Sequence, residues 1–108
     1  MAFGRGWDAG VVIEFLIRHA DEVPVIPGDV RAVLTPTEVG AEHVAGWGDH
    51  RVRVGDTEIS FALEPAGWQL SFEGPMALEA AEQFVSAVAD RMAAAVGESM
   101  KYVCISQA

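Results

Sequence analysis

The densest group of side chains that could do chemistry lies between Glu42 and His50. Within it His43, Asp49 and His50 are residue types that bind transition metals. The two histidines are separated by glycines and do not stand one helical turn apart, as in a helical metal site. We therefore predict a solvated turn leading into a strand, and we keep a small enzyme or metal-dependent site around residues 42–50 as an alternative hypothesis.

Other residue types that could support catalysis lack a matching arrangement. The single cysteine, Cys104, lies in an apolar stretch, where a thiol packs as a small inert group. Glu58, Glu64 and Glu73 are predicted to share one polar sheet face, and a flat solvated face has no cleft for acid–base catalysis. The GRG and GWG segments match no nucleotide-binding fingerprint. We predict no catalytic residue, no metal and no cofactor, and favour a protein that is not an enzyme.

Trp47 points to binding instead. It stands between two glycines in a loop that carries acidic residues. Such a tryptophan is either a lid on the core, which we favour because tryptophan is mostly buried, or an exposed anchor for a partner. The predicted partner-binding residues are Glu38, Glu42, His43, Trp47, Asp49 and His50.

Charge and composition limit the partners and the location. The chain of 108 residues has a formal net charge of −9. Nucleic acids and anionic membranes both require a basic surface, so both are disfavoured, whereas a basic protein partner is favoured. The lone cysteine excludes an internal disulfide framework, and no apolar segment predicts a membrane span or signal peptide. We therefore predict a cytoplasmic protein.

The clearest structural signal is the period-two pattern over residues 51–73. Turns at 55–56 and 64–67 place the large apolar residues of three strands on one face, and a slip of one residue would break this agreement. The same register sets Arg53 beside Glu58 as a favourable cross-strand charge pair. We predict a three-stranded antiparallel meander.

A helix and a strand follow the meander. Residues 75–97 carry an apolar stripe at helical spacing, with Pro75 suited to the first position and Gly97 to the C-terminal cap. Residues 101–106 alternate, but both faces are fairly apolar, which is typical of a strand set between two others.

The first part of the chain is more ambiguous. Residues 1–7 contain glycines and no periodicity, which predicts a flexible arm. Residues 8–23 place charged residues at helical spacing between Asp8 as N-cap and Pro24, so we predict a helix, with a strand over Val11–Ile17 as the alternative. Further on, 29–34 is predicted as a short strand, and Thr35 to Glu38 as a capping box that starts a short helix.

Together these elements predict one two-layer α+β domain over residues 1–108, a mostly antiparallel sheet covered on one face by helices 8–23 and 75–97. The order helix, meander, helix is similar to the double-stranded-RNA-binding domain. That family binds phosphates through lysines at the start of its last helix, but residues 75–79 read PMALE here and a further strand follows. The resemblance therefore implies part of a topology and no RNA-binding function.

The function that these features favour is a non-catalytic protein-interaction module. An immunity or antitoxin-like inhibitor of a basic partner is its most concrete form, by analogy of size and charge. A self-associating, ligand-binding domain that uses the open sheet face or a free edge to form a homodimer is a further alternative.

Overall fold

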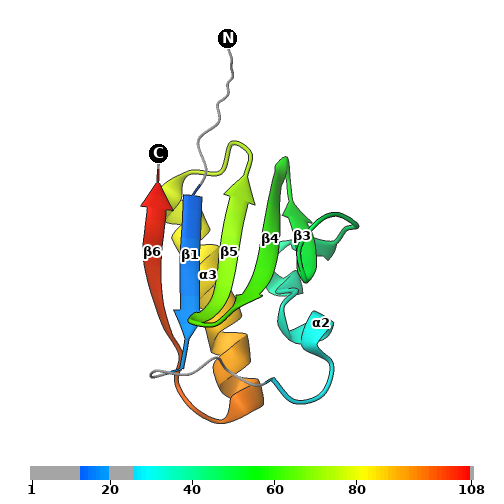
Figure 1. Ribbon diagram of the computed structural model, residues 1–108. Coiled ribbons are helices and arrows are strands. Elements are labelled where there is room, and N and C mark those ends of the chain that lie inside the picture. Colours follow the sequence, from blue (N-terminus) through cyan, green and yellow to red (C-terminus); the bar gives the residue numbers. More distant parts are fainter. Residues whose placement is uncertain (1–12, 20–25, 108) are drawn as a thin grey trace.

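The computed structural model describes residues 13–19 and 26–107, and the predicted arm at 1–7 lies outside them. Six strands form an antiparallel sheet in the order β2-β3-β4-β5-β1-β6, and one long helix lies against it (Figure 1). This confirms the predicted α+β class. The elements are, in chain order, β1 (Ile13–Arg18), α2 (Val30–Val33), the 3-10 turn η1 (Thr37–Val39), β2 (Glu42–His43), β3 (His50–Val54), β4 (Thr57–Glu64), β5 (Gly67–Glu73), α3 (Leu78–Val96) and β6 (Lys101–Gln107).

The helix predicted over 8–23 is wrong where the structure describes it, because residues 13–18 form strand β1. Alternate residues Ile13, Phe15 and Ile17 are buried in the core, and those between them are only partly buried. β1 lies between β5 and β6 and pairs with both, so backbone hydrogen bonds on its two sides stabilise the strand. The alternative strand prediction was therefore right for this part. The first helix on which the similarity to the double-stranded-RNA-binding domain depended is a strand at residues 13–18.

The predicted meander is confirmed, with β3, β4 and β5 as its strands. Its registers are those expected from the turns: Val52 lies opposite Ile59, and Phe61 lies opposite Leu70. All four side chains are fully buried. The apolar face of the meander is therefore one wall of the core.

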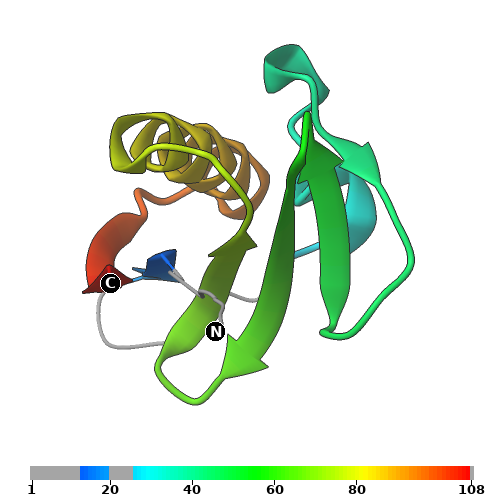
Figure 2. The same cartoon turned by 90° about the horizontal axis from the view of Figure 1, so that it is seen from above.

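Helix α3 forms the other wall. Seen from above, it lies over the β5-β1-β6 side of the sheet (Figure 2). It begins at Leu78 after the N-cap Ala77, three residues later than Pro75 suggested, and Gly97 caps its end in the left-handed conformation as predicted. Its buried residues are Ala81, Phe84, Val85, Val88, Ala89 and Met92.

The segment before the meander folds differently from the prediction. Residues 30–33 form helix α2 with Asp29 as N-cap, where we predicted a strand, because the Asp29 side chain accepts a hydrogen bond from the Ala32 amide. Thr35 caps no helix, since its hydroxyl is bonded elsewhere, and the predicted short helix is only the 3-10 turn η1. Arg91 of α3 donates to the carbonyl of Val33, which ties α2 to the long helix.

β6 occupies a different position from the one predicted for residues 101–106. It is a strand as expected, but it lies at the edge of the sheet, and β1 takes the internal place beside it. No helix in the described part of the chain is long and apolar enough to cross a membrane.

Two substitutions in β1 distinguish a strand from a helix at residues 13–18. The helix would bury Leu16 and Ile17 together, whereas the strand buries Ile17 completely and Leu16 partly. We expect Ile17→Ala to lower the free energy of unfolding by about 2–5 kcal/mol, and Leu16→Ala by less than half as much. Urea unfolding of both variants measures these changes in the free energy of unfolding. Equal decreases for Ile17→Ala and Leu16→Ala would contradict the strand.

Candidate partner-binding site

The loop of residues 44–49 joins β2 to β3 and is held at both ends. The Val44 amide donates to the Arg51 carbonyl at 3.0 Å, and the Asp49 amide donates to the Phe61 carbonyl at 2.8 Å. The Asp49 carboxylate also accepts from the Leu63 amide at 2.7 Å, so this acid ties the loop to β4. The loop is therefore anchored to the rigid meander.

Trp47 stands on this loop as an exposed side chain, with 56% of its surface accessible. The lid interpretation favoured from the sequence is therefore not what the structure shows. The Arg51 guanidinium lies 5.3 Å from the centre of the indole, a cation–π contact that supports one side of Trp47. A Cβ on Gly46 would overlap the side chain of Arg51, so the loop approaches this arginine closely because residue 46 is glycine.

Arg51 is the centre of the polar sheet face and is only 8% exposed. Its Nε donates to Glu58 at 2.6 Å and its Nη2 to Glu73 at 2.7 Å, while Nη1 donates to the Ser60 hydroxyl. Burial opposes the charge, but the bonds and charges of the two glutamates outweigh it and raise the pKa of Arg51. Arg51 therefore remains charged and fixed.

The sequence did not single out Arg51, although the register contained the signal. Glu58 and Glu73 lie directly opposite each other, and the repulsion between their carboxylates favours a cation nearby. The predicted pairing of Arg53 with Glu58 is right in register, yet the ion pairs differ: Glu58 binds Arg51, and Arg53 binds Glu42.

The predicted acidic residues are engaged within the protein. Glu42 pairs with Arg53, and Glu38 pairs with Arg91 of α3 at 2.9 Å. Glu38 thus belongs to the contact between η1 and α3, whereas residues 42, 43, 47, 49 and 50 gather around the loop. Each of these two carboxylates therefore has a cationic partner within the chain.

His50 is buried beneath the loop, with 4% of its surface exposed, where the sequence predicted a solvated turn. The Thr35 hydroxyl donates its one hydrogen to the Arg31 carbonyl at 2.7 Å. It must therefore accept from Nε2 of His50, 2.9 Å away, which leaves Nδ1 as a bare acceptor. Nδ1 is buried and has no hydrogen-bond partner among residues 13–19 and 26–107, and the ring of His43 stacks on His50 at 5.2 Å between centres.

This environment keeps His50 neutral. Burial, together with the charges of His43 and Arg31, lowers the pKa of His50 to about 4, and the nearby Asp29 opposes this shift only in part. The neutral ring packs edge-on against Phe61 of the core.

A hollow of about 250 Å³ lies at this end of the sheet. His43, Asp49 and His50 all line it, but no group of three or more His, Cys, Asp or Glu side chains in residues 13–19 and 26–107 is arranged to hold a metal ion. The three residues therefore do not form the three-ligand site of the alternative hypothesis. The full lining is Arg31, His43, Val44, Ala45, Gly46, Gly48, Asp49, His50 and Arg51.

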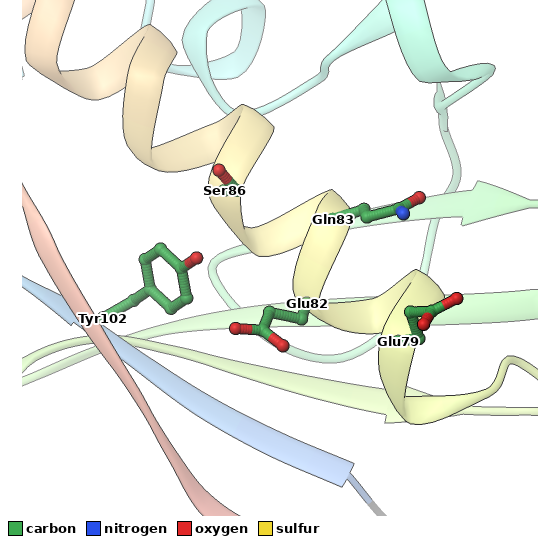
Figure 3. Close-up of a pocket in the computed structure, with 5 residues that line it drawn as sticks. All are labelled: Glu79, Glu82, Gln83, Ser86 and Tyr102. Carbon is green, nitrogen blue, oxygen red and sulfur yellow. The ribbon is translucent and has the colours of Figure 1, made fainter.

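A second hollow, of about 320 Å³, lies between α3 and β6. Tyr102 points from β6 toward the helix, and the carboxylate of Glu82 extends into the same space (Figure 3). Glu79, Gln83 and Ser86 complete its lining. No predicted site residue belongs to it, and it is an acidic groove far in sequence from the 44–49 loop.

Comparison with known proteins gives no match: no protein family, no curated protein and no solved structure resembles this chain closely enough to be matched. The site is therefore interpreted from its own geometry.

The buried His50 predicts a pH dependence of stability. Its folded pKa of about 4 lies below the ordinary value of 6.5, so the unfolded chain takes up a proton first as the pH falls. The contribution of His50 to the free energy of unfolding should decrease by roughly 3 kcal/mol between pH 6.5 and 4, and this loss should be absent above pH 7. His50→Gln keeps a donor toward Thr35 but does not titrate. The free energy of unfolding, measured by denaturant titration at several pH values in this range, should fall more steeply for the wild-type chain than for His50→Gln. The same fall in both proteins would contradict the assignment of this pH dependence to His50.

The geometry of Arg51 predicts that lysine cannot replace it. A lysine keeps the charge but lacks the fork that binds Glu58, Glu73 and Ser60 together. We expect Arg51→Lys to lower the free energy of unfolding by about 1–2 kcal/mol. Arg53→Lys on the same strand, in an exposed ion pair with Glu42, should cost less than about 0.5 kcal/mol. If chemical denaturation shows that Arg51→Lys and Arg53→Lys lower the free energy of unfolding equally, the special role of Arg51 is refuted.

Proposed function

We propose that this protein is a non-catalytic protein-binding module that presents Trp47 to its partner. The observation that carries the proposal is a large aromatic side chain that is 56% exposed and yet held from one side by Arg51. Exposed tryptophans on a rigid support are typical binding hot spots, because they bury a large area at a small cost in side-chain entropy.

The support beneath Trp47 strengthens the proposal. Arg51 is fixed by two carboxylates and a hydroxyl, and the loop is bonded to β3 and β4. A partner that covers Trp47 therefore does not have to order the loop first, which lowers the entropic cost of binding.

The partner that we propose is a basic protein. The formal net charge of −9 attracts a basic surface over long distances and accelerates the encounter. Because Glu38, Glu42 and Asp49 have partners within the chain, we assign this attraction to the charge of the whole protein. An immunity or antitoxin-like inhibitor in the cytoplasm is the specific form of this proposal.

Removal of the Trp47 side chain tests the anchor. We expect Trp47→Ala to weaken binding of the partner, captured by pull-down and then purified, by about 2 kcal/mol or roughly thirtyfold. The control is Leu78→Ala, which removes an exposed apolar side chain at the start of α3. Isothermal titration of both variants gives the affinities, and an unchanged affinity for Trp47→Ala would reject the anchor.

The charge of the partner is tested separately by salt. The association rate with a basic partner should fall as the ionic strength rises, because salt screens the attraction. A salt-independent rate would remove the electrostatic part of the proposal and leave the Trp47 anchor to the mutational test.

A further inference from the structure

β6 is an edge strand with the sequence of an internal one. It pairs with β1 on one side, and no other strand in the described residues lies on its outer side. Val103 and Ile105 are 51% and 48% exposed on the sheet face away from α3, while Tyr102 and Cys104 pack against the core. Apolar residues on both faces are typical of a strand with neighbours on both sides.

The opposite edge of the sheet is shorter and more charged than β6. β2 has only the two residues Glu42 and His43, and Glu42 is charged and paired with Arg53. Short, charged edge strands resist pairing with other chains. β6 spans seven residues and contains neither proline nor an acidic residue. In a protein of net charge −9, its edge is therefore a place where a second copy meets little repulsion.

Few charges lie along this edge. Lys101, at the start of β6 and opposite Arg18 of β1, is the one charged residue of the strand. Glu14 of β1 faces the other way, since its carboxylate accepts from Gln69 and Ser71 of β5. Antiparallel pairing of two β6 strands places the two Lys101 side chains at opposite ends of the contact, so that they do not repel each other.

We infer that β6 pairs with β6 of a second copy of this chain, so that two sheets join into one across a two-fold axis. The β1–β6 ladder is regular from Lys101 to Cys104 and has a bulge beyond it, at the point where Glu14 is followed by Phe15. We place the axis beside Val103, which lies within the regular part, so that Lys101 of each copy lies opposite Ile105 of the other. It sets Val103 against its own copy and Tyr102 against Cys104, with matching faces of the sheet.

The first experiment measures the oligomeric state by sedimentation over a wide concentration range. We expect the full chain to have twice the monomer mass of 11.5 kDa. Val103→Glu places two carboxylates across the axis and should give a monomer. Leu63→Glu makes the same change at a side chain that is equally exposed, at 50%, but lies at the end of β4, and it should remain a dimer. A wild-type monomer at all concentrations, or a dimer with Val103→Glu, overturns the inference.

A cysteine cross-link tests the register without relying on a disrupted variant. In a Cys104→Ser background, Val103→Cys places two thiols opposite each other across the axis, at a separation that suits a disulfide. Mild oxidation should give a covalent dimer, which reducing gel electrophoresis reverses. Leu63→Cys in the same background should stay monomeric on the gel. Equal cross-linking at both positions, or none at 103, contradicts this pairing.

Discussion

The guanidinium of Arg51 holds together a sheet face that would otherwise repel itself. Glu58 and Glu73 lie directly opposite each other on β4 and β5, and like charges in this position destabilise a sheet. Arg51 reaches from β3 and binds both, so that one side chain links three strands. Its remaining face supports Trp47, which makes the exposed loop an extension of the sheet.

The other side of the same region is organised around a neutral imidazole. His50 occupies the core beneath β2 and α2, with Thr35 fixing its tautomer and His43 covering its ring. Nδ1 of His50 finds no partner in the described part of the chain, and the surrounding packing must outweigh the free-energy cost of burying it. A charged arginine on the polar face and an uncharged histidine on the core face thus fix the start of β3 from both sides.

The acidic character of the chain is distributed unevenly over this fold. The outer side of α3 carries acidic residues that border the groove with Tyr102, whereas β6 carries only Lys101 as a charge. The two surfaces proposed for binding therefore differ in chemistry. The Trp47 loop offers one aromatic anchor on an acidic body, and the β6 edge offers backbone groups and apolar side chains with little charge. A dimer through β6 leaves the loop, at the opposite edge of the sheet, free for a partner.

The sequence by itself determined the meander, α3 and β6, because a period of two or of 3.6 residues and the turn chemistry act over a few neighbours. It did not determine β1. Residues 13–18 fit either a helix or a strand locally, and the place between β5 and β6 decides in favour of the strand. The same holds for the site. Burial of His50, exposure of Trp47 and the bridging by Arg51 arise from residues far apart in the chain, so only the tertiary structure brings their partners together.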